Sequence, residues 1–200
     1  MVVPVCASHV DVPEGIQRVS RLEPWVQACG LSEHPGRCFS IIFIMAYWLM
    51  KSEPAEASID HLAECPRQTL PWFGVRNYQA RNFMRDQMKA GDGVLFYHSS
   101  CAEPGIAGIA KVVSAAYPDA SQFDPKSKYF DASATRENPR WFNVDVQLVK
   151  KTRLVSLSEL RSYSTLESMR ILQRGNRLSI TPVTAGEWKF IGKLINAPAP

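Results

Sequence analysis

The sequence lacks the residue patterns that identify the common classes of enzyme and metalloprotein. It has no GxSxG nucleophile elbow, no phosphate-binding P-loop, no GxGxxG after a strand and no HExxH. Its five cysteines form no CxxC pair and no Cys/His spacing suited to zinc, so we expect neither a metal nor a cofactor. An odd, scattered set of cysteines is typical of reduced thiols, which predicts a cytoplasmic location.

Long hydrophobic runs are also scarce. The run Phe39–Met50 is too short to cross a bilayer, so we expect no membrane partner. Residues 1–44 lack clear periodicity and are rich in Pro, Gly and Cys, and Met45 has the character of a natural start. We therefore expect an N-terminal extension over residues 1–44, disordered or not native, and one folded domain over residues 45–200.

Charge is unevenly distributed between these two parts. Residues 1–44 carry three Arg against four acids, whereas residues 45–200 carry 20 bases against 15 acids. This excess of positive charge permits a polyanionic partner such as nucleic acid, but many proteins with neutral ligands are equally basic.

Periodicity predicts an α+β fold from Met45 onward. Strands are expected over residues 47–51, 93–98, 105–114, 141–149 and 177–183. The last contains Pro182, which favours an edge strand, and the paired Gly105 and Gly108 indicate close approach of another backbone.

Helix starts are marked by capping residues. Ser58 and Asn77 are placed to cap helices, the second running from Tyr78 to about Ala90. Capping-box patterns predict three further starts, at Ser156…Glu159, Ser164…Glu167 and Thr184…Glu187.

The segment Trp72–Asn82 is the most informative. A Trp, a Tyr, two Asn, a Gln and two Arg surround Gly74, and such side chains suit a planar heterocycle beside a phosphate. A plainer alternative assigns Trp72 to the core and the arginines to a solvated helix face. The basic stripe of Arg81, Arg85 and Lys89, spaced four residues apart, is open to the same two interpretations.

Catalytic interpretations of the remaining polar residues are weaker. His98 and Ser99 are neighbours on a predicted strand and point to opposite faces, so they do not form a nucleophile–base pair. Asp119, Asp124 and Asp131 lie in a Pro-rich loop, where turn formation is the simpler role. We therefore expect a binding module rather than an enzyme.

Five ordered segments follow one known pattern: Tyr47–Pro54, Trp72–Asn82, Phe96–Ser99, Gly105–Gly108 and Arg177–Val183. Together they resemble the EVE domain, the family of thymocyte nuclear protein 1, from about Tyr47 to Ile195. The resemblance implies a PUA-like pseudo-β-barrel of mixed strands with helices packed around it, akin to YTH and ASCH domains. It also implies a non-enzymatic module that recognises a modified nucleobase, especially modified cytosine in DNA.

The resemblance also implies site residues. Lys51 and Ser52 match the strand-end pair that borders the YTH pocket, Trp72 lies where the first cage aromatic comes, and Tyr78 or Tyr97 are candidates for the other wall. The predicted base-binding residues are Lys51, Ser52, Trp72, Arg76, Asn77, Tyr78, Arg81, Tyr97, His98 and Ser99, and the predicted phosphate contacts are Arg81, Arg85 and Lys89.

Two alternative functions stay open at this point. An RNA-binding PUA-like module would need 2′-hydroxyl contacts. A small-molecule or nucleotide-processing enzyme would use the same pocket with His98 as acid or base. Oligomeric state is equally open.

The extension over residues 1–44 yields the first testable prediction. A chain that starts at Met45 should unfold at the same temperature as the full chain, because the periodic pattern begins there. Thermal unfolding of both chains checks this, and a drop of more than a few degrees would mean that the extension stabilises the domain.

Overall fold

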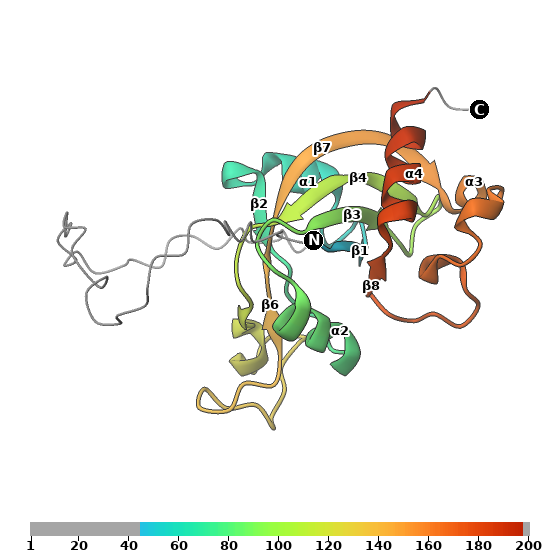
Figure 1. The fold of residues 1–200 in the computed structure, drawn as a ribbon. Coiled ribbons are helices and arrows are strands. Elements are labelled where there is room, and N and C mark those ends of the chain that lie inside the picture. Colours follow the sequence, from blue (N-terminus) through green and yellow to red (C-terminus); the bar gives the residue numbers. More distant parts are fainter. Residues whose placement is uncertain (1–44, 198–200) are drawn as a thin grey trace, which may run out of the picture. The chain divides into compact units, whose positions relative to one another are not determined.

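A curved six-stranded mixed sheet forms the centre of the computed structural model, which describes residues 45–197 (Figure 1). The strand order is β2-β7-β4-β3-β1-β8, and only the β1–β3 pair is parallel. The strands are β1 (Tyr47–Ser52), β2 (Thr69–Pro71), β3 (Gly93–His98), β4 (Gly105–Val112), β7 (Asp145–Ser156) and β8 (Ile180–Val183). The predicted α+β class is confirmed, while the predicted extension lies outside the described residues.

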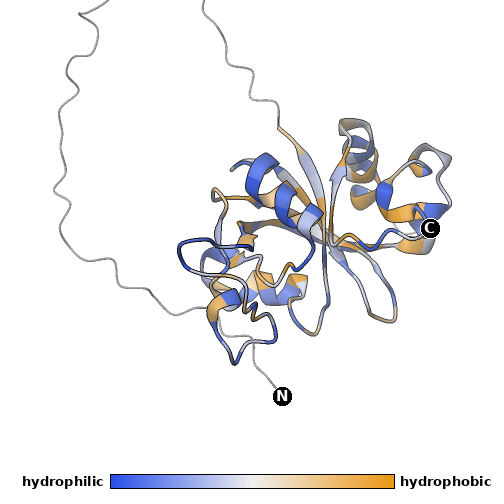
Figure 2. Cartoon of the chain, turned by 90° about the horizontal axis from the view of Figure 1, so that it is seen from below, coloured by the Kyte–Doolittle hydropathy of each residue, from blue (hydrophilic) through white to orange (hydrophobic). Residues whose placement is uncertain are grey.

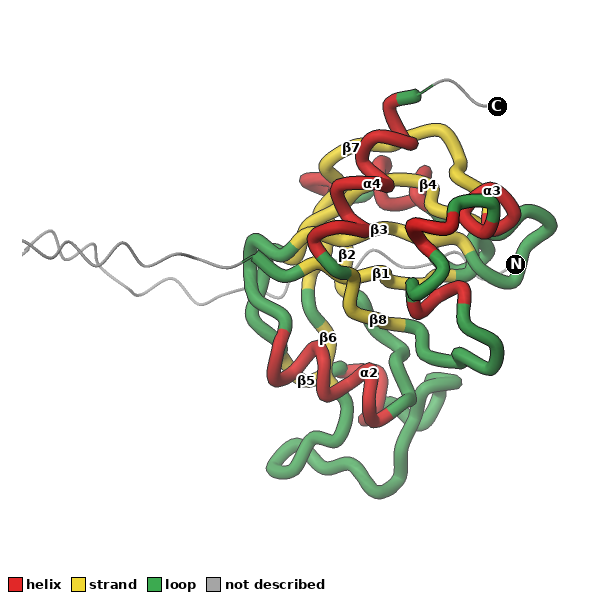
Figure 3. The backbone as a smooth tube through the Cα atoms, turned by 45° about the vertical axis from the view of Figure 1, so that its right-hand side comes forward, coloured by secondary structure: helices red, strands yellow, loops and turns green. Residues whose placement is uncertain are grey.

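Helices cover both faces of this sheet. They are α1 (Ile59–Glu64), α2 (Tyr78–Asn82), α3 (Leu157–Arg161) and α4 (Ala185–Asn196), with short helical turns at Pro66–Gln68, Phe83–Gln87, Ala120–Phe123, Ser164–Leu166 and Arg170–Leu172. A small second sheet pairs β5 (Tyr117–Pro118) with β6 (Phe142–Asn143). Figure 3 shows α2 with β5 and β6 at one end of the domain, apart from α3 and α4.

Two hydrophobic cores lie on the two sides of the sheet, because successive strand residues point to opposite faces. In β3, Phe96 packs into the core that contains α1 and α2, whereas Tyr97 packs into the core of α3 and α4. In β1, Trp48 and Leu49 divide in the same way. The helices carry both hydrophilic and hydrophobic residues (Figure 2), as expected for helices with one face on a core.

Several predicted helix starts are confirmed. The Ser58 hydroxyl accepts a hydrogen bond from His61 N, the Asn77 amide oxygen accepts from Gln79 N and Ala80 N, and Thr184 forms a complete capping box with Glu187. Each cap satisfies backbone N–H groups that lack partners in the first helical turn.

Other helix predictions need correction. The helix expected to reach Ala90 ends early, because a π-turn over Phe83–Gln87 closes on a Met88 N–H bond to the Phe83 carbonyl. Ser156 caps α3, but the Glu159 carboxylate binds Arg153 instead of returning to the cap. Ser164 begins only a 3₁₀ turn without a side-chain cap.

The strand predictions also need two corrections. The segment 141–149 divides into β6 and β7, and β7 continues to Ser156. The last strand begins at Ile180 rather than at residue 177, although Pro182 does lie in an edge strand, as predicted.

The predicted close approach at Gly105 is confirmed. A Cβ atom on Gly105 would lie 2.4 Å from the Val155 carbonyl oxygen, and one on Gly108 would lie 2.8 Å from the Lys150 carbonyl oxygen. These glycines let β4 and β7 approach each other where their register is irregular.

Among residues 45–197, no helix has the length and apolar character that a membrane span requires.

A matched pair of glycine substitutions tests the packing of β4 on β7. Gly105→Ala should destabilise the domain by about 1–3 kcal/mol, because the added methyl group would overlap the strand backbone. Gly192→Ala, where a Cβ would meet nothing within 4 Å, should stabilise α4 by up to about 1 kcal/mol. Urea unfolding measures both, and equal effects would contradict the close approach.

Candidate functional site

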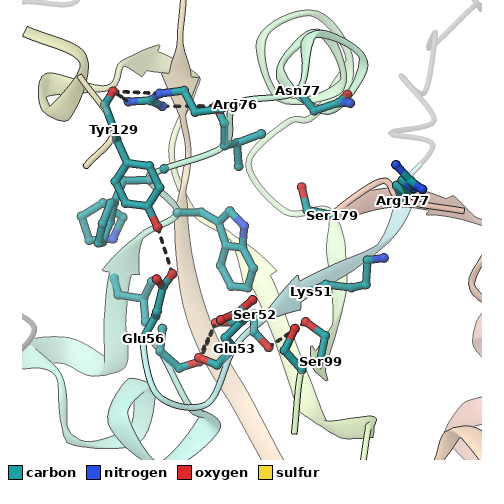
Figure 4. A pocket seen from close by; sticks show the side chains of 18 residues that line it. Lys51, Ser52, Glu53, Glu56, Arg76, Asn77, Ser99, Tyr129, Arg177 and Ser179 are labelled. Atoms are coloured by element: carbon teal, nitrogen blue, oxygen red, sulfur yellow. Dashed lines mark hydrogen bonds between the residues drawn. The ribbon is translucent and has the colours of Figure 1, made fainter. Parts of the chain in front are cut away.

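A cavity of about 450 Å³ opens beside the C-terminal end of β1 (Figure 4). Its lining residues are Lys51, Ser52, Glu53, Glu56, Ala57, Leu70, Pro71, Trp72, Phe73, Gly74, Val75, Arg76, Asn77, Ser99, Ser100, Tyr129, Arg177 and Ser179. Leu70 belongs to edge strand β2, and Ser179 directly precedes the opposite edge strand, β8. The curvature of the sheet therefore brings its two edges to one cavity, whose volume lies in the range of small-ligand sites.

Trp72 forms part of the cavity wall and also belongs to the core. Only 5% of its surface is exposed, and its ring packs edge-on against Phe96 at a centroid distance of 5.4 Å. Both interpretations of Trp72 from the sequence therefore have a structural basis. Substitutions that remove this ring would change stability as well as binding.

The turn after Trp72 depends on Gly74. Its φ of +79° belongs to the left-handed region, and a Cβ there would lie 2.6 Å from the ring of Tyr129. Phe73, half exposed beside it, packs edge-on against the same ring at 6.0 Å.

Arg76 holds the loop that follows β5. Its guanidinium donates to the Asp119 carboxylate at 2.8 Å, to the Ser121 hydroxyl at 3.0 Å and to the Tyr129 carbonyl at 2.9 Å. Arg76 was predicted to contact the ligand directly, yet its donors are engaged in these internal bonds. Arg76 is therefore a structural part of the cavity wall.

Asp119 is the buried carboxylate that binds the Arg76 guanidinium. Its side chain is 2% exposed and also accepts a hydrogen bond from Gly74 N at 3.0 Å. Burial would raise the pKa of Asp119, but hydrogen bonds from Ser121, Arg76 and Gly74 outweigh it and hold the pKa below its usual value.

Tyr129 forms the wall opposite β1. Its hydroxyl donates to the Glu56 carboxylate at 2.9 Å, and Lys128 forms an ion pair with the same carboxylate. Burial raises the pKa of Tyr129; the carboxylate of Glu53 adds to this rise, and Arg76 opposes it. Tyr129 was not among the predicted site residues, because it lies in an aperiodic loop more than 50 residues after Gly74.

Other polar groups of the cavity are also engaged. The Ser52 hydroxyl donates to the Ala57 carbonyl at 2.6 Å, and the Ser99 hydroxyl donates to the Ser52 carbonyl at 3.3 Å. The Asn77 oxygen caps α2, which leaves its NH₂ group as the available donor.

Five charged or hydroxyl-bearing side chains of the cavity have no hydrogen bond or ion pair within residues 45–197: Lys51, Glu53, Ser100, Arg177 and Ser179. Burial lowers the pKa of Lys51. In Figure 4, Lys51 and Arg177 lie on the same side of the cavity as Ser99 and Ser179, with Glu56 and Tyr129 on the other side. The available groups are thus two cations, one carboxylate and two hydroxyls, besides the NH₂ group of Asn77.

Two of the predicted base-binding residues lie on the outer side of α2. Tyr78 stacks on Trp141 with a centroid distance of 5.0 Å, and the Arg81 guanidinium lies 5.0 Å from the Tyr78 ring centre. Arg81 also donates to the Arg140 carbonyl at 2.6 Å. Neither residue lines the cavity, so neither provides its second wall.

Tyr97 and His98 also lie outside the cavity lining. Tyr97 is 2% exposed and points into the core of α3 and α4, because strand alternation sends it away from Phe96. The His98 Nε2 atom accepts a hydrogen bond from Ile59 N at 3.0 Å and so supports the start of α1. Burial lowers the pKa of His98.

The predicted basic stripe is interrupted. Arg85 is paired with its neighbour Asp86 at 2.7 Å, and Lys89 follows the end of the helical segment. Phosphate contacts by Arg81, Arg85 and Lys89 stay a prediction. Arg177, from the other side of the cavity, is a cation without an ion pair in the described residues, and this prediction missed it.

Metal chemistry has no obvious site. The structure describes no group of three or more His, Cys, Asp or Glu side chains that would hold a metal ion within residues 45–197. Asp119, Asp124 and Asp131 act in turns and ion pairs, in line with the simpler interpretation of that loop.

Comparison with known proteins identifies the family. The EVE domain model matches residues 46–194. This chain belongs to the EVE domain family. Thymocyte nuclear protein 1 of Gallus gallus is 46% identical over 163 residues, covering 72% of this chain and 66% of the relative. The human protein is 45% identical over 166 residues, covering 74% and 73%.

Solved structures agree with this assignment. Human THYN1 protein in complex with DNA containing 5-methylcytosine is 44% identical with a TM-score of 0.73, covering 77% of this chain and 99% of that one. A protein of Pseudomonas syringae is 51% identical with a TM-score of 0.71, covering 74% and 99%. The expected EVE family and mixed α+β fold are thereby confirmed, while a cytoplasmic location stays a prediction.

Asp119 gives a prediction about pH. Asp119→Asn should lower stability at pH 7 by about 1.5–3 kcal/mol, because a buried charged acceptor is lost. The pKa of Asp119 in the folded protein lies below the unfolded value of about 3.9, so its stabilisation is present above that pH and is lost as the pH falls through the folded value. The variant should therefore lose less stability than the parent as the pH falls below about 4.

Urea unfolding at several pH values measures this difference. Asp124→Asn in the same loop is the control, because the Asp124 side chain is exposed and caps only a turn at Lys126 N. Parallel acid profiles for all three proteins would contradict the role assigned to Asp119.

Proposed function

We propose that this chain is a non-enzymatic module that binds a modified nucleobase of DNA in the cavity, with modified cytosine as the class of base. The observation that carries the proposal is a cavity with Trp72 in its wall and Lys51, Glu53 and Arg177 unengaged, in a chain 44% identical to a human protein solved with 5-methylcytosine DNA. A base inside a duplex would have to be extruded to reach it.

The chemistry of the cavity suits a nucleotide. Trp72, Leu70 and Val75 provide apolar wall for the faces and methyl group of a base. Lys51 and Arg177 provide positive charge for a phosphate, and Glu53 and Asn77 provide an acceptor and a donor for a base edge.

Binding without catalysis is favoured because the Ser52 and Ser99 hydroxyls and the His98 ring already form hydrogen bonds within the protein. The Ser52 and Ser99 hydroxyl protons are donated to backbone carbonyls, which removes them as activated nucleophiles. His98 lies outside the cavity lining and its Nε2 atom already accepts a backbone N–H bond. For His98 to act as an acid or base through Nε2, that atom would have to lose the hydrogen bond from Ile59 N at the start of α1.

The direct test compares DNA duplexes that differ at one position, cytosine or 5-methylcytosine, by fluorescence anisotropy. The methylated duplex should bind more tightly. RNA of the same sequence is the second arm, and tighter binding to RNA would replace the DNA assignment with the RNA-binding alternative. Conversion of the oligonucleotide, detected by mass spectrometry, would overturn the non-enzymatic assignment.

Trp72 gives the matching mutational prediction. Trp72→Phe should keep the core filled but reduce the stacking surface, so preference for the methylated base should fall by roughly threefold to tenfold, a fraction of the about 1–3 kcal/mol of a full base–aromatic stack. Substitution by alanine is unsuitable, because removing a buried Trp costs about 3–5 kcal/mol of stability.

Trp188→Phe is the matched control. Trp188 stacks on Tyr47 at 4.5 Å, packs partly buried against the core of α3 and α4 and does not line the cavity. Its variant should also lose stability while retaining the preference for the methylated base. Equal preference in both variants would assign Trp72 to the core alone.

A further inference from the structure

We propose that Glu53 separates 5-methylcytosine from thymine in this cavity by accepting a hydrogen bond from the exocyclic amino group at position 4 of the base. The inference rests on the proposed function and assigns the part of the base edge that the cavity reads.

The two bases differ in only a few atoms. Both carry the C5 methyl group, so an apolar contact with that methyl group cannot distinguish them. At position 4, cytosine presents an amino donor and thymine a carbonyl acceptor. A group that only accepts hydrogen bonds, such as an ionised carboxylate, will attract the first and repel the second.

Glu53 is the available side chain of this kind. The other cavity carboxylate, Glu56, is engaged by the Tyr129 hydroxyl and by Lys128. The Asn77 oxygen is engaged by two backbone N–H groups of α2. Within residues 45–197, the Glu53 carboxylate has no hydrogen bond or ion pair, so an incoming amino group need not displace a partner.

The position of Glu53 fits contact with a ligand. It directly follows β1, lies next to Ser52 in the cavity lining and is labelled there in Figure 4. Its charge also reaches the opposite wall, since it adds to the rise in the pKa of Tyr129 that burial causes. The carboxylate thus acts on the space between β1 and Tyr129, where a base would lie.

The negative charge of Glu53 is unfavourable beside DNA unless the ligand forms a bond with it. An unpaired carboxylate beside DNA repels the phosphates, and in this cavity it works against the attraction of Lys51 and Arg177. Since Glu53 is exposed in the free protein, it contributes no buried ion pair to the fold. A hydrogen bond from the amino group of the base to the Glu53 carboxylate would offset its repulsion of the phosphates.

The experiment uses the full chain and four single-stranded DNA probes that are identical except for one base: cytosine, 5-methylcytosine, uracil or thymine. Single strands remove the difference in base-pairing free energy, and the four bases separate the effect of the methyl group from that of position 4. The wild type should bind 5-methylcytosine about tenfold or more tightly than thymine.

Glu53→Gln should reduce that ratio to nearly one, because an amide can turn either its oxygen or its NH₂ group toward position 4. Glu56→Gln is the matched control: it removes the same charge from the same cavity, so it should raise affinity for all four probes alike and leave the ratio unchanged. Thermal unfolding should confirm that both variants remain folded.

The outcomes separate the two levels of the proposal. If the wild type prefers 5-methylcytosine over cytosine but Glu53→Gln keeps the wild-type ratio of 5-methylcytosine to thymine, the role of Glu53 is overturned and the proposed function stands. A wild type that binds cytosine and 5-methylcytosine equally would overturn both. A reduced ratio in Glu56→Gln as well would assign discrimination to net charge and reject the specific hydrogen bond.

Discussion

The cavity depends on the hydrogen bonds that the buried carboxylate of Asp119 accepts. This carboxylate accepts hydrogen bonds from Gly74 N, from the Arg76 guanidinium, and from both the backbone N–H and the hydroxyl of Ser121. These donors come from two segments more than 40 residues apart, the turn after β2 and the loop after β5. One desolvated charge therefore fixes both the turn after Trp72 and the loop that carries Tyr129, and its four hydrogen bonds make its burial tolerable.

Position in the sheet decides which polar strand residues serve the site and which serve the fold. Lys51 and Tyr97 are paired in the parallel ladder, so both side chains leave the same face of the sheet. Lys51 lies at the end of β1 and lines the cavity, whereas Tyr97 is covered by the core of α3 and α4. Proximity to the site in the sheet is therefore a weak guide to function, because neighbouring elements cover one residue and leave its partner accessible.

Local features of this protein were predictable from the sequence, and contacts between distant segments were not. The caps at Asn77 and Thr184 and the close approach at Gly105 follow from a few neighbouring residues. Glu53 and Arg177 lie inside segments that resemble the EVE family, yet nothing in the residues themselves distinguished them from their neighbours. Tyr129 joins the cavity through tertiary contacts with Arg76, Glu56 and Phe73, and such contacts have no periodic signature in the sequence.

Hydrogen bonding divides the cavity into a supporting part and an available part. Arg76, Glu56 and the Ser52 hydroxyl are engaged within the protein, and a ligand that recruited them would break bonds that shape the walls. Lys51 is different: burial lowers its pKa, so its ammonium is less stabilised in the free protein than in water. A phosphate placed beside it would reverse that shift. Lys51 and Arg177, the two cavity cations without an ion pair within residues 45–197, are therefore the side chains with the most to gain from an anionic ligand.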